Sequence, residues 1–171
     1  MSIAAVMPKP VLDLGQLTRM GPTALAQVYA AGTLPELPSV SGVPHGRMLA
    51  LDALGDSPRI ARLAAKLRFP WRGKSFSGDS TFAGEGINRI RLFGDRQWYR
   101  FETYTAPSVL DGQPCVLLNY DLADNPWFIR RIRDEIREVA SGLFMGPALV
   151  RKRGRHTRVL HFAIDHGSAA T

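Results

Sequence analysis

The sequence predicts an α+β protein that is mainly antiparallel β. A small barrel forms its larger part, with helices near the N-terminus and one helix inserted before the last strands. Two observations predict the barrel. Apolar residues recur with period two over most of 86–165, which is the spacing of strands that bury one face. Within that stretch, Gly94-Asp95 and Asp111-Gly112 are dipeptides typical of tight hairpin turns.

The N-terminal part follows a different pattern. Residues 1–12 indicate a loose leader, and residues 13–171 a single barrel domain that starts with helical segments. Over 13–31 the apolar residues recur at helical spacing, and Gly21-Pro22 divides this stretch into two short pieces. Residues 33–47 are rich in Pro, Gly and Ser, which predicts a loop.

A capping residue followed by proline predicts two further helices. Ser57-Pro58 begins one that ends near Arg68, because proline at the first helical position lacks only an N–H that would have no partner. Asn125-Pro126 begins the inserted helix, which Gly142 is placed to end. The apolar stripe of the inserted helix is Ile129, Ile132, Ile136 and Val139.

The two turn dipeptides fix a strand register if each forms a two-residue turn. Ile90 then opposes Tyr99 and Asn88 opposes Phe101, while Thr103 opposes Tyr120 and Thr105 opposes Leu118. Directly opposed residues share a face of the sheet. The predicted inner face is Asn88, Ile90, Leu92, Tyr99, Phe101, Thr103, Val116, Leu118 and Tyr120. The opposite face carries nearly all of the charge, so two independent turn signals agree on one inside and one outside.

Two more strands are predicted over 143–150 and 158–165, joined around the basic tip 151–155. Leu160, Phe162 and Ile164 would face inward. The basic tip has two interpretations: a contact for phosphate or anionic lipid, or a charged hairpin end that resists edge pairing.

Polar groups on the inner face predict a ligand cavity. A solid core would use aliphatic side chains, because buried polar groups need partners. Apolar walls with a few polar groups are typical of small-molecule sites. The predicted ligand-binding residues are Asn88, Tyr99, Phe101, Thr103 and Tyr120, with Arg130 added from a nearby cluster of Arg and Asp that could clamp a carboxylate. The alternatives remain open: the hydroxyls bond to backbone or water, and the Arg/Asp cluster is the laced outer face of a helix.

Two residues are candidates for catalysis. His45 lies in a Gly/Pro loop that could cover the mouth of a barrel and is the best candidate for proton transfer. Tyr120 would orient a carbonyl group of the ligand. No pair of histidines has the spacing of metal ligands and no dinucleotide or phosphate-binding loop is found, so neither a metal nor a cofactor is expected.

Composition narrows the class of protein. The single cysteine, Cys115, excludes an internal disulfide framework and fits a reducing cytosol. No apolar run reaches the roughly 18–20 residues of a membrane span, and the first residues lack the pattern of a signal peptide, so a cytoplasmic protein is expected. The net charge of +7 is interpreted as a basic solvated surface, and nucleic acid is not expected as a partner. The oligomeric state stays open.

Several motifs resemble a group of bacterial lipocalin-like, calycin-type proteins. They are Pro70-Trp71-Arg72-Gly73-Lys74-Ser75-Phe76, Tyr120-Asp121 with Asn125-Pro126, Arg133-Asp134-Glu135-Ile136-Arg137, and residues 142–149. The resemblance covers about 66–165 and implies a barrel able to hold a hydrophobic small molecule. It implies no catalytic residues.

The sequence therefore leaves three hypotheses for the function. The first is binding of a small hydrophobic molecule, such as a lipid, isoprenoid or polyketide-like compound, inside the barrel. The second is a cyclase or isomerase that acts on such a ligand in the same cavity. The third is a basic surface module that binds nucleic acid or an anionic membrane.

Overall fold

The computed structural model describes residues 12–52, 71–78, 83–91 and 95–167. The chain begins with three short helices, α1 (Leu14–Leu17), α2 (Pro22–Ala31) and α3 (Leu37–Val40). Asp13 caps α1 by accepting a hydrogen bond from the Gln16 backbone N–H at 2.6 Å. The predicted break before Pro22 is confirmed. Residues 1–11 of the predicted leader 1–12 lie outside the described residues, as does the predicted helix that starts at Ser57-Pro58.

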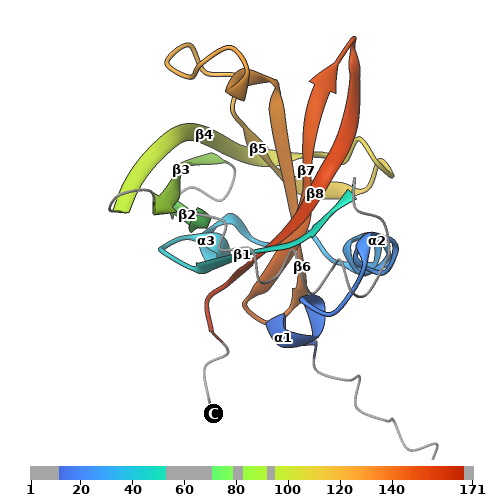
Figure 1. Ribbon diagram of the computed structural model, residues 1–171. Coiled ribbons are helices and arrows are strands. Elements are labelled where there is room, and N and C mark those ends of the chain that lie inside the picture. The colour runs from blue at the N-terminus through green and yellow to red at the C-terminus, as the bar shows by residue number, and fades with distance from the viewer. Residues whose placement is uncertain (1–11, 53–70, 79–82, 92–94, 168–171) are drawn as a thin grey trace, which may run out of the picture.

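The described residues form one antiparallel sheet of eight strands, in the order β1-β8-β7-β6-β5-β4-β3-β2 (Figure 1). Each strand from β2 to β7 pairs with the next along the chain, and β1 pairs with β8. The strands are β1 (His45–Leu51), β2 (Trp71–Ser77), β3 (Ala83–Arg91), β4 (Asp95–Pro107), β5 (Pro114–Asn119), β6 (Ile132–Ala140), β7 (Leu143–Lys152) and β8 (Arg155–Asp165). The predicted mainly antiparallel β fold with N-terminal helices is confirmed.

The sheet curls until its two edge strands, β1 and β2, almost meet. A Cβ on Gly46 of β1 would lie 2.1 Å from the Gly73 Cα of β2, so only glycine allows the two backbones this close. Just before β1, Gly42 and Phe76 exchange two backbone hydrogen bonds of 2.9 and 3.0 Å. These contacts make a nearly closed barrel, which limits the exposed sheet edge.

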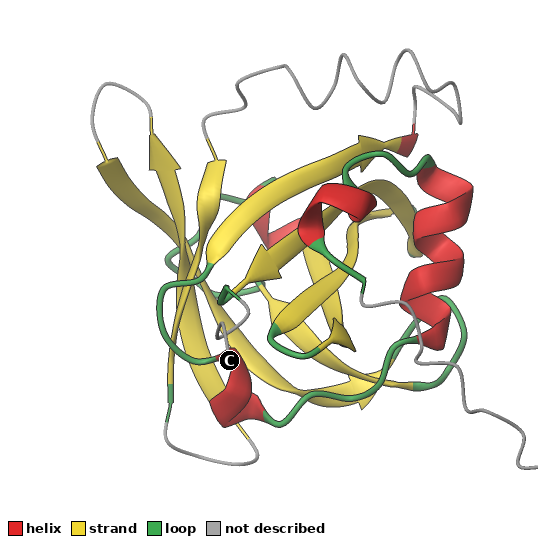
Figure 2. Cartoon of the chain, turned by 90° about the horizontal axis from the view of Figure 1, so that it is seen from below, coloured by secondary structure: helices red, strands yellow, loops and turns green. Residues whose placement is uncertain are grey.

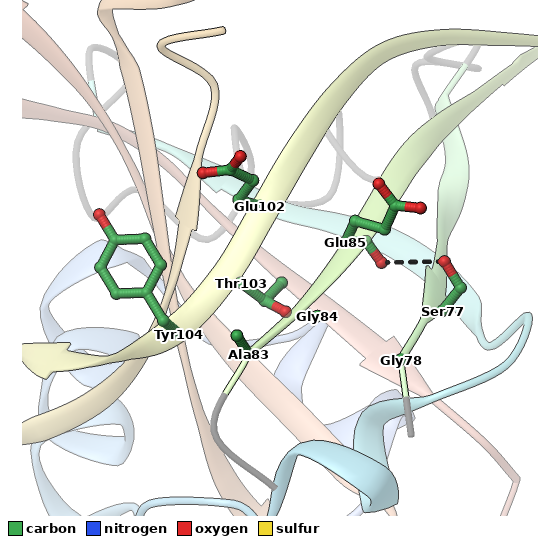
Figure 3. Close-up of a pocket in the computed structure, with 8 residues that line it drawn as sticks. All are labelled: Ser77, Gly78, Ala83, Gly84, Glu85, Glu102, Thr103 and Tyr104. Atoms are coloured by element: carbon green, nitrogen blue, oxygen red, sulfur yellow. Dashed lines mark hydrogen bonds between the residues drawn. The ribbon is translucent and has the colours of Figure 1, made fainter. Parts of the chain in front are cut away.

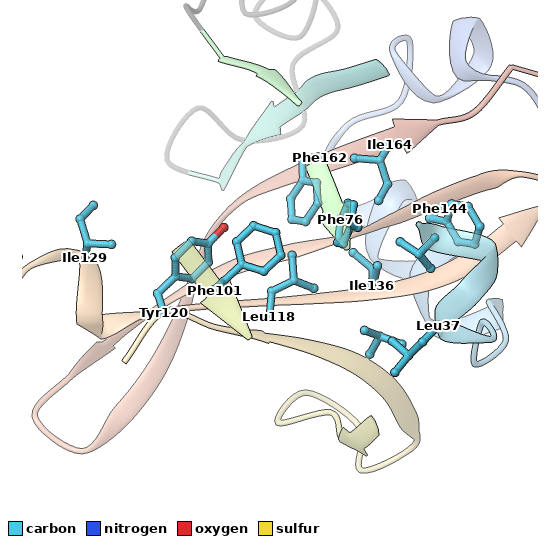
Figure 4. Close-up of a cluster of buried hydrophobic side chains, with 12 residues drawn as sticks. Leu37, Phe76, Phe101, Leu118, Tyr120, Ile129, Ile136, Phe144, Phe162 and Ile164 are labelled. Atoms are coloured by element: carbon cyan, nitrogen blue, oxygen red, sulfur yellow. The ribbon is translucent and has the colours of Figure 1, made fainter. Parts of the chain in front are cut away.

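Two apolar cores lie on the two faces of this sheet. The inner core fills the barrel around Phe101, Leu118, Ile136 and Phe144, none of which is measurably exposed (Figure 4). The outer core lies between the sheet and the first two helices, where Leu17, Leu25 and Tyr29 meet strand residues such as Met145 and Ala163. Figure 2 shows the helices against the outside of the barrel. Outward residues of β7 and β8 are therefore buried as well as inward ones.

The two ends of the barrel differ. Leu37 and Val40 of α3 join the inner core together with Phe144 and Ile164, so α3 plugs one end. The β5–β6 and β7–β8 connections leave from the opposite end, because successive hairpins of a meander alternate between ends. In Figure 4, Ile129 and Tyr120 lie at one side of the cluster and Leu37 at the other. The end away from α3 is called the open end below.

The predicted helix over 125–141 is wrong. A single 3₁₀ turn, η2 (Ile129–Arg131), follows Pro126, and the chain then enters strand β6. Ile132, Asp134 and Ile136 alternate toward the barrel interior. The period of two was hidden because a charged residue takes one inward position. Isoleucine and valine favour strands, and both neighbouring strands supply backbone partners for β6.

The predicted hairpin register is also wrong, although the predicted inner face is right for its described members. Thr103 opposes Leu118 and not Tyr120, because the β4–β5 loop spans 108–113 and is longer than two residues. That is a shift of two residues, and an even shift leaves every side chain on its face. On the other side of β4, Asn88 opposes Trp98 and not Phe101. A bulge follows at Tyr99, whose φ of 63° is a left-handed value.

Candidate functional site

A cavity of about 300 Å³ occupies the open end of the barrel. All of the strands except β5 contribute side chains to its wall. Tyr120, just after β5, and Ile129, just before β6, supply the rest. Most of the lining is apolar or aromatic. The lining residues are Met48, Trp71, Lys74, Asn88, Ile90, Tyr99, Tyr120, Ile129, Ile132, Asp134, Ala148, Leu160 and Phe162.

Four polar side chains meet in the cavity wall. Lys74 Nζ lies 2.8 Å from Asn88 Oδ1 and 2.8 Å from Asp134 Oδ2. It also donates to the Tyr120 hydroxyl at 2.5 Å, so the ammonium has three acceptors. The Tyr120 hydroxyl donates in turn to Asp134 Oδ2 at 3.1 Å. The Trp71 indole N–H donates to Asn88 Oδ1 at 3.1 Å and fixes the orientation of the amide. These four side chains, Lys74, Asn88, Tyr120 and Asp134, are called the polar cluster below.

The polar cluster is buried, which shifts its protonation equilibria. Exposed fractions are 3% for Lys74 and 4% for Asp134. Burial lowers the pKa of the Lys74 ammonium, and the Asp134 carboxylate opposes that shift. Burial and the nearby Asp134 charge raise the pKa of the Tyr120 hydroxyl well above its usual value. Tyr120 is therefore a neutral phenol at physiological pH and serves as a hydrogen-bond donor.

Aromatic rings surround the lysine side chain. Its Nζ lies 5.0 Å from the centre of the Phe162 ring and 5.2 Å from that of Phe101. The ring of Trp71 is 5.4 Å away. Ring faces attract a desolvated cation, so the ammonium is held by three hydrogen bonds and by the surrounding rings.

One oxygen of the polar cluster is left without a partner. Asp134 Oδ1 is buried and has no hydrogen-bond partner among the residues that the structure describes. A buried carboxylate oxygen without a donor costs about 1–3 kcal/mol or more. Because Asp134 lines the cavity, a ligand hydroxyl or amine is the kind of group that would satisfy this oxygen.

The structure brings three of the predicted ligand-binding residues to the cavity wall. They are Asn88, Tyr99 and Tyr120. Phe101 packs under the cavity, with its ring 5.2 Å from that of Tyr120. Thr103 lies farther toward the plugged end and lines a different pocket.

His45 and Arg130 lie away from the cavity. The predicted loop around His45 is wrong at that residue, because His45 begins strand β1, pairs with Asp165 and is exposed. Strand β8 offers a backbone partner there, which the Gly/Pro composition did not reveal. Arg130 donates to Asp121 at 2.7 Å on the surface, where its side chain is 45% exposed. Neither residue is among those that line the cavity.

A second pocket lies at the far end of β2, β3 and β4 (Figure 3). Its volume is about 510 Å³ and it is open to solvent. Glu85 and Glu102 flank it, and the Ser77 hydroxyl donates to the Glu85 backbone carbonyl at 3.5 Å. Glu85 also pairs with Arg100 at 2.6 Å. Its described lining residues form no buried polar cluster comparable to that of the cavity.

Other buried charges of β6 belong to a structural clamp on the outer face. Glu135 accepts hydrogen bonds from the Tyr29 hydroxyl at 2.9 Å and the Ser108 hydroxyl at 2.5 Å. Arg137 forms a bidentate pair with Asp111 at 2.7 and 2.8 Å. Together these bonds tie α2 and the 108–113 loop to β6. In place of the i,i+4 ion pairs expected on a helix, Glu135 and Arg137 make contacts with distant segments.

Sequence reasoning missed two members of the polar cluster, Lys74 and Asp134. Both residues stand in motifs that resemble lipocalin-like proteins, but that resemblance implies no catalytic residues, and Asp134 falls in the segment predicted as a helix. One signal was available: Lys74 and Phe76 are two residues apart in a segment that also contains Trp71. A lysine in register with aromatic residues is a candidate for an inward position.

Comparison with known proteins supports the fold and no more. A crystal structure described as a protein from Thermomonospora curvata matches with a TM-score of 0.53 and 16% sequence identity. The match covers 85% of this chain and 87% of that one. At this identity the likeness shows a shared fold alone. No protein-family model matches the chain, and no curated protein matches it.

None of the helices in the described segments is both long and apolar enough to cross a bilayer.

Proposed function

We propose that the cavity binds a small apolar molecule that carries one hydrogen-bond donor. The observation that carries this proposal is the mainly apolar cavity of about 300 Å³ lined by Asp134, whose buried Oδ1 has no hydrogen-bond partner among the described residues. Apolar walls supply the affinity, and a few fixed polar groups supply orientation. A hydroxyl or amine of the ligand would donate to Asp134, while Tyr120 and Lys74 hold the carboxylate in place.

The size of the cavity restricts the class of ligand. About 300 Å³ is at the lower end of the range for small-molecule sites. A compact isoprenoid- or polyketide-like molecule suits this volume better than a long acyl chain. Such a carrier function agrees with the lipocalin-like resemblance of the sequence motifs.

A second candidate is an isomerase or cyclase that uses the same cavity. The observation that favours it is the hydrogen-bonded series from Lys74 through the Tyr120 hydroxyl to Asp134. Tyr120 keeps its proton because its pKa is raised, so its hydroxyl could donate a hydrogen bond that polarises a ligand carbonyl, with Lys74 as the neighbouring cation. Turnover that is lost in Tyr120→Phe while ligand affinity remains would establish this function over simple binding.

Two matched probes test the binding proposal. 2-Naphthol and 2-methoxynaphthalene share an apolar ring system, but only the first carries a hydroxyl donor. We expect 2-naphthol to bind the wild-type protein roughly tenfold more tightly, because it can satisfy a buried charged acceptor. The double variant Lys74→Met/Asp134→Leu should lose this preference and still bind both probes. Isothermal titration calorimetry measures the affinities.

A steric variant supplies the control. Ala148→Phe places a ring in the cavity wall and should abolish binding of both probes. Ala30→Phe makes the same change on the exposed side of α2 and should leave both affinities unchanged. Binding that survives Ala148→Phe would contradict the proposed site. Native mass spectrometry of protein purified from its own host would then identify any ligand that the protein retains.

A further inference from the structure

The open end of the barrel exposes two large aromatic side chains next to each other. Trp127 is 68% exposed and Phe128 is 50% exposed. Their ring centres are 5.9 Å apart, and the two rings meet edge to face. They lie in the β5–β6 connection, directly before Ile129, which lines the cavity. Adjacent exposed rings in a loop are typical of a surface that contacts another protein or a membrane.

Basic side chains gather at the same end. The segments 121–131 and 151–155 contain six basic residues and two acidic ones. The first segment is the β5–β6 connection and the second is the tip of the β7–β8 hairpin, and both project from the open end in Figure 1. Asp121 joins them, because it accepts from Arg130 at 2.7 Å and lies 3.9 Å from Arg151. The open end is therefore cationic around an aromatic centre.

We propose that this open-end face docks on an anionic lipid surface. The face consists of Trp127, Phe128, Arg130, Arg131 and the 151–155 tip. Tryptophan and phenylalanine insert at the boundary between headgroups and acyl chains. Lysine and arginine are attracted to anionic headgroups. The combination of a small aromatic centre with a basic surround matches both parts of such a membrane.

The geometry of the rings favours lipid over nucleic acid. The Arg131 guanidinium lies 4.8 Å from the centre of the Trp127 ring and covers one of its faces. The neighbouring Phe128 ring meets Trp127 at 88°, so the two rings do not make a flat platform for stacked bases. Insertion into a headgroup layer needs only apolar volume at the tip of a loop, which both rings supply.

The inference goes beyond the proposed binding function and does not depend on it. Docking through this face would place the open end against the membrane, which is the end that holds the cavity. An apolar ligand could then pass between bilayer and cavity with little exposure to water. The docking face and the cavity share no side chain, so substitutions can disrupt one without the other.

Co-sedimentation of the full-length protein with vesicles tests the inference. One set of vesicles is phosphatidylcholine alone, and the other also contains phosphatidylglycerol. We expect binding to the second set only, with an affinity that falls as salt is added. Replacing Arg151, Lys152, Arg153 and Arg155 with glutamine should weaken binding at least about tenfold. Trp127→Ala/Phe128→Ala should do the same, because it removes the apolar anchor.

Control variants change similar side chains elsewhere. Val109→Ala/Leu110→Ala removes two apolar side chains, each 43% exposed, from the opposite end of the barrel. Arg19→Gln removes one exposed charge just after α1, away from the open end. Both controls should bind vesicles like the wild type. Because all of these side chains are exposed, the variants are expected to fold, and circular dichroism checks this.

A second measurement locates the anchor. The chain has three tryptophans, so Trp71→Phe/Trp98→Phe leaves Trp127 as the fluorescent one. Bromine-labelled lipids in anionic vesicles should quench it. Equal binding to both kinds of vesicle, or binding to a single-stranded oligonucleotide without binding to anionic vesicles, would overturn the inference. The Ala148→Phe variant, which blocks the cavity, should still bind vesicles, so failure of one proposal does not imply failure of the other.

Discussion

Acid should destabilise this protein through one buried histidine, His161. The side chain is 0% exposed on β8, and neither ring nitrogen has a hydrogen-bond partner among the described residues. Burial, together with the nearby Arg158 guanidinium, lowers the pKa of His161 from 6.5 to about 4, and Asp52 opposes the shift. The folded protein therefore keeps this imidazole neutral at a pH where the unfolded chain has already protonated it.

The sign and size of the effect follow from that difference. As the pH falls below 6.5, the unfolded state binds a proton that the folded state does not, so the free energy of unfolding decreases. The loss ends near pH 4, where both states are protonated. Each pKa unit corresponds to about 1.4 kcal/mol, so the total loss is about 3 kcal/mol. This is a large part of the roughly 5–15 kcal/mol of a typical domain.

Urea denaturation between pH 7 and pH 4 measures the effect. Carboxylates also titrate in this range, so the informative quantity is the difference between the wild type and His161→Leu. We expect the variant to lose about 3 kcal/mol less than the wild type. His45→Leu, which removes an exposed imidazole, should keep the acid loss of the wild type. Parallel pH profiles for wild type and His161→Leu would refute the reasoning.

Three further predictions concern buried groups. Burial raises the pKa of the Cys115 thiol to about 12, so Ellman's reagent should react with it only after unfolding; fast reaction in native buffer would contradict this. Arg137→Met should cost about 1–3 kcal/mol in urea denaturation, because it leaves several backbone carbonyls without their donor, whereas the exposed Asp111 carboxylate can turn to water; a loss below about 0.5 kcal/mol would show that the clamp is dispensable. Lys74→Met alone should cost about 3–5 kcal/mol because Asp134 stays buried without a cation, whereas Lys74→Met/Asp134→Leu should recover most of the loss. Equal stability of this single and double variant would contradict the ion-pair interpretation.

Local pattern predicted which side chains face the interior better than it predicted which strand positions pair. Thr103 and Leu118 were both placed inward, as found, although they were not expected to oppose each other. The 108–113 loop closes through a Ser108 N–H to Gln113 carbonyl bond of 2.9 Å. Glu135, from the next strand, holds that loop through Ser108 and the Val109 N–H. The loop length, and therefore the register, depends on a residue far from the turn dipeptide.

The misassigned segment 125–141 shows a different limit. Its isoleucines fit both a helical stripe and an alternating strand, and buried Asp134, Glu135 and Arg137 conceal the alternation. A strand in the centre of a sheet can carry these charges because each has a partner from elsewhere in the fold. Asp134 pairs with Lys74, and Arg137 pairs with Asp111. A prediction made from one segment of sequence cannot include such partners, because they come from distant segments.

The sequence by itself determined the break before α2, the run of antiparallel strands, and the inward position of Asn88, Tyr99 and Tyr120. These depend on short-range spacing, backbone preferences of Gly and Pro, and the alternation of side chains along a strand. Only the tertiary structure decided that β6 is a strand and that Lys74 meets Asp134 across 60 residues of chain. Closure of the barrel brings β2 and β6 to the same cavity wall. Because Lys74 and Asp134 are buried there, each stays charged only while it is paired with the other.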